Sequence, residues 1–210
     1  MAYILTAEDK DFFLGVGQDE ILLENARRDR IAHMVCGHRR YRLGDEQAEN
    51  LDRYESWQDW LDTEVLEYNG GAENVFYLPL YLYDHSGLTM NTTGFNCRWD
   101  SGQVGWIYVL KTDIEHLFYF ENKDELKTRA IEIMEKEVEI YNMYLTGQVY
   151  YYELSQKNIC ECCGNVELGL IDKAFEIVAQ SLDELKEILM NDAYIGDIFG
   201  NLINELKEVY

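Results

Sequence analysis

Apolar and aromatic side chains alternate along residues 75–83, and this alternation is the clearest hydrophobic pattern in the chain. A period of two is typical of a β-strand, because successive side chains point to opposite faces. The pattern predicts a tyrosine-rich face and an aliphatic face, the latter formed by Phe76, Leu78, Leu80 and Leu82. Pro79 has no amide proton to donate, so it predicts a sheet edge or a bulge at that point.

Two further strands are predicted after this one. Turn-forming residues at 84–87 precede residues 88–93, which can return as a paired strand, and a second turn falls at 100–102. Residues 104–110 are apolar on both faces, which is typical of the middle strand of a covered sheet. We therefore expect three antiparallel strands in this region.

Helices are predicted where apolar residues recur three and four positions apart, over residues 46–68, 122–146 and 181–208. Asn122 and Ser181 each stand where a side chain can cap the first helical turn, and a glutamate follows each of them three residues later.

The fold class that these elements predict is α+β, an antiparallel β-sheet covered by several α-helices. We expect the sheet to contain residues 75–110 and 148–154 and a strand at Met34. The length of the chain fits a single domain over residues 1–210, with a possible helical C-terminal extension over residues 176–210.

Acidic residues outnumber basic ones, 40 against 18, which gives a net charge of −22, and −11 of it falls in residues 121–210. Such a charge repels nucleic-acid phosphates and attracts basic protein surfaces, so we expect no direct nucleic-acid binding. The alternative interpretation of the same charge is good solubility.

Export and membrane insertion are not expected. No apolar run reaches 18 residues, and no secretion signal is visible. The five cysteines are an odd number, which in this context predicts reduced thiols and a cytoplasmic location. The sequence leaves the oligomeric state open.

Six of the nine arginines fall in residues 27–42, against the overall charge. Guanidinium groups bind carboxylates and phosphates through two parallel hydrogen bonds, so a phosphate-bearing ligand is one interpretation of His38, Arg39 and Arg40. The interpretation that we favour is that these arginines pair with the surplus carboxylates of the chain itself.

A catalytic site is a further alternative. His38, Asp84, His85 and Asp100 have the side chains of a general acid, a base or an orienting group, with Ser86, Cys97 and Ser101 as nearby nucleophiles. No nucleophile elbow or triad spacing accompanies them, and such residues are common in hairpin turns.

Cys160 and Cys163 form half of a zinc-binding pattern, C-x-x-C-G. A complete site would need two more ligands from elsewhere, such as Cys36 with His38 or Cys97 with His85. Packed or free thiols are the simpler interpretation, so we expect no cofactor, with structural zinc as the alternative.

Three segments resemble an uncharacterised protein family of phages, plasmids and other mobile elements. They are MVCGHRRYRLGDEQ (34–47), PLYLYDHSGLTMNTTGFNCRWDSGQVGWIYV (79–109) and EVEIYNMYLTGQVYYYEL (137–154), which contain the HRRYxLGD, YDHSG and WDSGQVG motifs. The resemblance carries no catalytic assignment. It implies a mobile-element setting, in which small acidic proteins that disarm host defence are common.

The leading functional hypothesis is an anti-defence protein, of the anti-CRISPR or antirestriction type, acting in the host cytoplasm. It would bind a host defence nuclease or another basic protein surface, with nucleic-acid mimicry as one mechanism, through exposed acids near the C-terminus: Glu132, Glu135, Glu139, Asp183, Glu184 and Glu187. The alternative is a ligand-binding protein or hydrolase whose site is formed by the HRRY, YDHSG and WDSGQVG segments. This alternative requires the three segments to meet in space.

Overall fold

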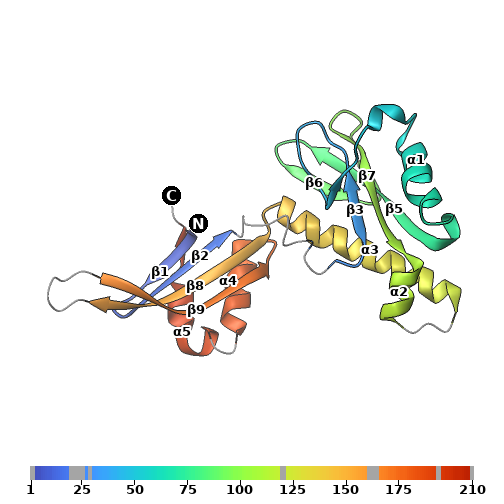
Figure 1. Ribbon diagram of the computed structural model, residues 1–210. Helices are drawn as coiled ribbons and strands as arrows, with labels where there is room; N and C mark the ends of the chain where they lie inside the picture. Colours follow the sequence, from blue (N-terminus) through green and yellow to red (C-terminus); the bar gives the residue numbers. More distant parts are fainter. Residues whose placement is uncertain are drawn as a thin grey trace. The chain divides into compact units, whose positions relative to one another are not determined.

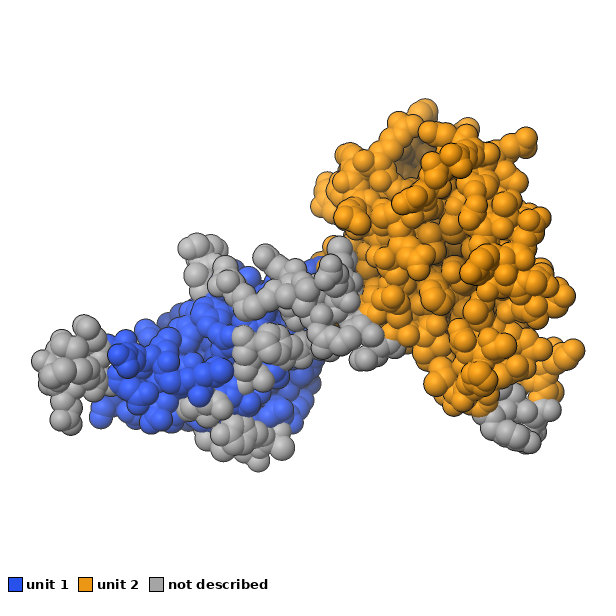
Figure 2. Space-filling view, viewed as in Figure 1, with its two compact units in different colours: residues 1–20, 147–210 blue, residues 21–146 orange. Residues whose placement is uncertain are grey.

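The computed structural model describes residues 3–18, 27, 30–118, 122–159, 166–192 and 195–208. The chain forms two compact units (Figure 2). Residues 1–20 and 147–210 form one, which we call the terminal unit, and residues 21–146 form the other, which we call the central unit. The two ends of the chain thus share a unit, and the central unit is inserted between them. The single domain expected for the whole chain stays a prediction.

The central unit is built on a five-stranded sheet with the strand order β4-β3-β7-β5-β6 (Figure 1). Its strands are His33–Cys36 (β3), Glu46–Gln47 (β4), Val75–Asp84 (β5), Leu88–Asn91 (β6) and Ser101–Leu110 (β7). Neighbouring strands are antiparallel except β3 and β4. The three predicted antiparallel strands are confirmed, and β7 lies in the middle of the sheet as its two apolar faces predicted. Pro79 is followed by a bulge at Leu80 and Tyr81.

Helical segments cover both faces of this sheet. They are Leu51–Arg53 (η2), Trp57–Trp60 (α1), Leu61–Glu67 (η3), Ala72–Asn74 (η4), Lys111–Leu117 (α2) and Lys123–Leu145 (α3). On one face, Ala130 and Met134 of α3 pack in a core that includes Ile107 of β7. On the other face, Leu61 packs in a core that includes Trp106. Successive residues of β7 are therefore buried on opposite sides.

The helix predicted over residues 46–68 is wrong in its first half. Residues 46 and 47 pair with β3 instead, and Asn50 has a left-handed backbone, with φ 54°. The helix begins only after Ser56, whose hydroxyl accepts a hydrogen bond from the Asp59 amide at 3.2 Å. The predicted cap of α3 is confirmed, since Asn122 Oδ1 accepts the Glu125 amide at 2.9 Å.

The terminal unit has a second antiparallel sheet, in the order β10-β1-β2-β8-β9. Its strands are Tyr3–Glu8 (β1), Phe12–Gln18 (β2), Val149–Ile159 (β8), Val166–Val178 (β9) and Lys207–Glu208 (β10). Helices Leu182–Asn191 (α4) and Ile195–Asn204 (α5) lie on one side of it (Figure 1). The prediction that residues 148–154 join the first sheet is wrong, because β8 pairs with β2 near the N-terminus. Within the described residues, no helix is both long and apolar enough to cross a membrane.

The close pairing of β3 and β7 predicts different effects of one substitution at two glycines of β7. A Cβ at Gly105 would lie 2.0 Å from the Val35 carbonyl oxygen, whereas a Cβ at Gly102 would have no atom within 4 Å. We expect Gly105→Ala to lower the free energy of unfolding by about 2 kcal/mol or more, since a backbone oxygen cannot move aside without breaking the ladder. We expect Gly102→Ala to change it by less than about 0.5 kcal/mol. Urea denaturation measures both values, and equal stability of the two variants would contradict this pairing.

Candidate functional site

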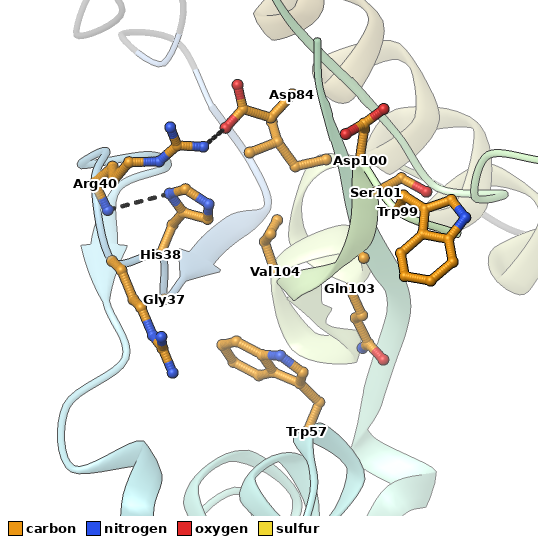
Figure 3. Close-up of a pocket in the computed structure, with 13 residues that line it drawn as sticks. Gly37, His38, Arg40, Trp57, Asp84, Trp99, Asp100, Ser101, Gln103 and Val104 are labelled. Carbon is orange, nitrogen blue, oxygen red and sulfur yellow. Dashed lines mark hydrogen bonds and ion pairs between the residues drawn. The ribbon is translucent and has the colours of Figure 1, made fainter. Parts of the chain in front are cut away.

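A cavity opens where β3 and β7 separate. The last paired residues are Cys36 and Gly105, and just beyond them the Gly37 amide donates a hydrogen bond to the Val104 carbonyl oxygen at 2.8 Å. The chain then leaves β7 as residues 38–45, which we call the arginine loop. The cavity between this loop and the beginning of β7 has a volume of about 730 Å³ (Figure 3).

This cavity brings together the three segments that the alternative functional hypothesis requires. It is lined by His38, Arg39 and Arg40 of the arginine loop, by Asp84 at the end of β5, and by Asp100 just before β7. Asp84 and Asp100 are neighbours because the Asp84 amide donates a hydrogen bond to the Asp100 carbonyl oxygen at 2.8 Å. The condition that the segments meet in space is fulfilled.

Polar contacts orient most of these side chains. Arg40 forms an ion pair with Asp84 (Figure 3), and His85, which does not line the cavity, places Nδ1 3.4 Å from Asp100 Oδ2. His38 Nδ1 accepts a hydrogen bond from the Arg40 amide at 3.3 Å. A neutral His38 ring therefore carries its proton on Nε2 and can donate it to a ligand.

Arg39 differs from its neighbours, because no described carboxylate lies within ion-pair distance of it. Pairing with the chain's own acids holds for Arg27, Arg30 and Arg40, and Arg28 lies outside the described residues. Arg42 lines a separate cavity of about 420 Å³ and, like Arg39, has no described carboxylate within ion-pair distance. In a chain with 40 acidic residues, an unpaired guanidinium beside a cavity is a candidate anion ligand.

Two tryptophans that sequence analysis did not select line the same cavity, Trp57 and Trp99 (Figure 3). Trp57 begins α1, where its carbonyl oxygen accepts the indole N–H of Trp106 at 2.7 Å. Trp99 is 92% exposed, so it contributes nothing to the core and offers its ring to a partner. Its place in a turn between two strands was the signal available in the sequence. Trp57 gave no such signal, because the helical pattern assigned it to the core.

The arrangement suits binding better than nucleophilic attack. The Ser101 hydroxyl donates its proton to the Cys97 carbonyl oxygen, and Cys97 Sγ lies 3.6 Å from Asp100 Oδ2. Neither group has a described histidine within hydrogen-bond distance. A catalytic role for His38, Asp84, His85 and Asp100 stays a prediction.

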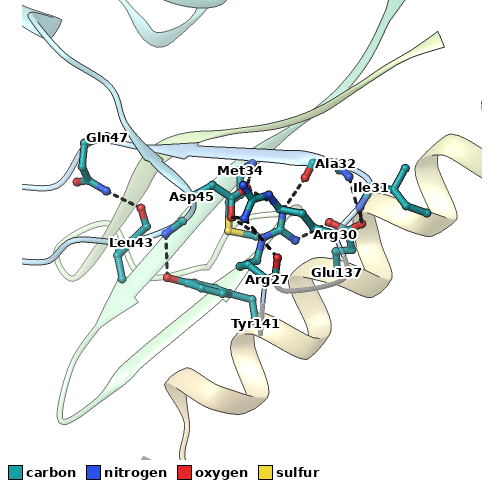
Figure 4. A network of polar contacts seen from close by, with 11 residues as sticks. Arg27, Arg30, Ile31, Ala32, Met34, Leu43, Asp45, Gln47, Glu137 and Tyr141 are labelled. Atoms are coloured by element: carbon teal, nitrogen blue, oxygen red, sulfur yellow. Dashed lines mark hydrogen bonds and ion pairs between the residues drawn. The ribbon is translucent and has the colours of Figure 1, made fainter. Parts of the chain in front are cut away.

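A buried ion network lies at the far end of the arginine loop (Figure 4). The Arg27 side chain is 2% exposed, and its Nε and Nη2 each lie 3.0 Å from a different oxygen of Asp45. Its Nη1 lies 2.5 Å from Glu137 on α3, and Nη2 also donates to the Ala32 carbonyl oxygen at 2.7 Å. Burial disfavours the charged guanidinium, but the two carboxylates outweigh it and raise the pKa of Arg27.

The same network fixes the end of the arginine loop to β3. The Met34 amide donates to Asp45 Oδ2 and the Asp45 amide to the Met34 carbonyl oxygen, both at 2.8 Å. Gly44 has φ 72°, and its amide donates to the Tyr141 hydroxyl at 2.8 Å. A Cβ on Gly44 would lie 2.5 Å from the Met34 carbonyl oxygen, so glycine is required there. The loop that carries Arg39 is thus held at both ends, by the β3–β7 ladder and by this network.

The zinc alternative gains no support from the described residues, in which no group of three or more His, Cys, Asp and Glu side chains is placed to hold a metal ion. Cys160 and Cys163 lie outside the described residues. Cys36 is fully buried, and its burial, together with the charge of Asp45, raises the pKa of the thiol to about 12. It therefore stays protonated at neutral pH, which disfavours metal binding.

The six acids of the mimicry hypothesis lie on two helices in separate units. Glu132, Glu135 and Glu139 are exposed on α3 of the central unit, where Glu132 pairs with Arg129 and Glu139 with Lys136. Asp183, Glu184 and Glu187 are exposed on α4 of the terminal unit, where Glu184 accepts the Gln180 amide. The structure therefore defines two acidic helix faces, each within its own unit.

Comparison of the chain with protein-family models, with curated proteins and with solved structures finds no match. The resemblance to a mobile-element family stays a prediction, and the proposals below rest on the site itself.

The buried network predicts a large loss of stability when its cation is removed. We expect Arg27→Met to lower the free energy of unfolding by about 3–5 kcal/mol, because it leaves Glu137 without its counter-charge and leaves Asp45 with only the more exposed Arg30, at 3.4 Å. Lys136→Met removes an exposed ion pair from α3, the helix that carries Glu137, and should lower the free energy of unfolding by no more than about 1 kcal/mol. Denaturant titration of both variants measures the difference, and a loss at Arg27 no larger than that at Lys136 would show that the network is dispensable.

Proposed function

We propose that the cavity of the central unit binds a small phosphorylated molecule with a planar ring, of the nucleoside monophosphate class. The observation that carries this proposal is Arg39, a guanidinium without a described carboxylate partner in a strongly acidic chain, at the wall of a cavity with two tryptophans. The volume of about 730 Å³ falls within the range of small-molecule sites.

Each part of such a ligand has a matching group in the cavity. Arg39 and the Nε2–H of His38 are donors for a phosphate, and their hydrogen bonds to an anion are strengthened by its charge. Trp57 and Trp99 offer flat faces to a base. Asp84 and Gln103, which also line the cavity, can accept hydrogen bonds from sugar hydroxyls.

Contacts inside the cavity reduce the repulsion that an acidic protein exerts on a phosphate. The Arg40–Asp84 pair neutralises one of the two carboxylates that line the cavity, and His85 lies beside the other, Asp100. Arg39 then supplies an unopposed positive charge at short range. A neighbouring charge at contact distance outweighs distant surface carboxylates, because salt screens interactions beyond about 10 Å.

Calorimetric titration with adenosine, guanosine, cytidine and uridine monophosphates tests this proposal. We expect at least one of them to bind, and Arg39→Gln to weaken its binding about tenfold or more through loss of a charge-assisted hydrogen bond. Arg53→Gln, which removes an arginine that does not line the cavity, is the matched control and should leave the affinity unchanged.

The unphosphorylated nucleoside and ribose 5-phosphate separate the two contributions. Both should bind more weakly than the complete nucleotide, since each lacks one of the groups recognised. The proposal is rejected if no monophosphate binds at millimolar concentration, or if Arg39→Gln and Arg53→Gln bind equally well.

We propose, as a second function, that the acidic surface docks on a basic host protein, in an anti-defence role against a restriction or CRISPR nuclease. The observation in its favour is the excess of acidic residues in the terminal unit. All nine arginines fall in the central unit, whereas the terminal unit has 17 acidic residues against five lysines. Asp183 and Glu187 of α4 are exposed and have no described ion-pair partner.

Charge reversal tests this second function. In cells that carry restriction or CRISPR defence, expression of the protein should increase plaque formation by a phage that this defence targets. Replacement of Asp183, Glu184 and Glu187 of α4 by lysine should abolish the increase, because repulsion replaces attraction at the basic surface. Replacement of Glu49, Asp52 and Glu73, exposed acids of the central unit, changes the net charge equally and should not. Equal effects of both triple variants would remove the specific docking surface.

A further inference from the structure

A second cavity adjoins the proposed nucleotide site. It has a volume of about 460 Å³ and is lined by Tyr81, by residues 93–96, by Arg98, and by Ser101 and Gly102. Ser101 and Gly102 also line the first cavity, so the same short piece of β7 separates the two.

The two cavities repeat the same chemistry. Arg98 lines the second cavity and, like Arg39 in the first, is exposed and has no described carboxylate within ion-pair distance. Tyr81 and Phe95 supply its aromatic walls, as Trp57 and Trp99 do in the first. Each cavity thus has one guanidinium without a described carboxylate partner and two aromatic rings.

The loop between the cavities is held in place. Asn91 Oδ1 accepts the Thr93 amide at 3.2 Å and the Gly94 amide at 2.7 Å, and the Ser101 hydroxyl bonds to the Cys97 carbonyl oxygen. Within this loop, the consecutive residues Arg98 and Trp99 line different cavities. A ligand that used both residues would have to cross the piece of β7 that the cavities share.

Gly102 leaves room for a ligand to pass over this piece of β7. A Cβ at this position would have no atom within 4 Å, so the space beside the backbone is empty on the side where a side chain would stand. The backbone conformation of Gly102 is not in the left-handed region, so a larger residue can be placed there without strain in the main chain.

We infer that the two cavities are subsites of one ligand, and that this ligand is a dinucleotide with two rings and two phosphates. This inference rests on the function proposed for the first cavity. One phosphate binds at Arg39 and the other at Arg98, and each base lies against the aromatic rings of its own subsite. A longer strand is disfavoured, because each added phosphate meets the field of a chain that has 40 acidic residues and 18 basic ones.

Linear and cyclic dinucleotides share this chemistry, and titration distinguishes them. The probes are AMP and GMP, the linear dinucleotides pApA and pGpG, cyclic di-AMP and cyclic di-GMP, and an eight-residue oligo(dA). We expect a linear or a cyclic dinucleotide to bind at least tenfold more tightly than its monophosphate. The dinucleotide form, linear or cyclic, that shows this increase in affinity identifies the class of ligand.

Two variants test whether the tighter binding of the dinucleotide depends on the second cavity. Arg98→Gln and Gly102→Leu, the second of which fills the crossing, should each reduce the ratio of monophosphate to dinucleotide dissociation constants to near one. Arg53→Gln should leave the ratio unchanged. A circular dichroism spectrum and an unfolding midpoint like those of the wild type show that the variants are folded, and Gly102→Ala, which adds little bulk, provides a milder form of the same block.

The outcomes separate this inference from the proposal on which it rests. Binding of a monophosphate with no gain for either dinucleotide, or a gain that survives Arg98→Gln, overturns the second subsite and leaves the proposed function standing. Tightest binding by the eight-residue strand overturns the assignment to a dinucleotide in favour of single-stranded nucleic acid. Binding of none of the probes overturns both.

Discussion

The buried guanidinium of Arg27 is the contact on which the central unit depends. It joins Asp45, at the end of the arginine loop, to Glu137 on α3, and Asp45 is in turn bonded to the backbone of β3 at Met34. Charges removed from water are stable only when all of them are paired, so the three side chains have to be in place together. This requirement sets where the arginine loop ends and how it meets the helix behind the sheet.

The site follows from that constraint. The arginine loop leaves the sheet at Gly37 and is fixed again at Gly44, so its middle part has to stand away from β7 and leave a cavity. Arg27 and Arg40 are paired with carboxylates, whereas Arg39, next to Arg40 on the loop, has no described carboxylate partner. The same arginine-rich segment therefore supplies a structural cation and a candidate ligand-binding cation.

Sequence patterns were sufficient where the deciding contacts are local. The alternation in residues 75–83 and the Asn122 cap predicted β5 and α3, and the two predicted turns place Asp84, at the end of β5, beside Asp100, just before β7. The second sheet could not be predicted, since the partners of β8 depend on β1 and β2 at the other end of the chain. The roles of individual arginines could not be predicted either, because ion pairing is decided by tertiary contacts rather than by spacing in the sequence.

A crystal structure of the protein with a bound nucleoside monophosphate tests the central claim most directly. The account predicts the phosphate within hydrogen-bond distance of the Arg39 guanidinium, the base against Trp57 or Trp99, and an Arg27 network that is unchanged. A phosphate bound instead at Arg42, in the cavity beside Arg27, or an Arg39 paired with one of the chain's own carboxylates, would contradict it.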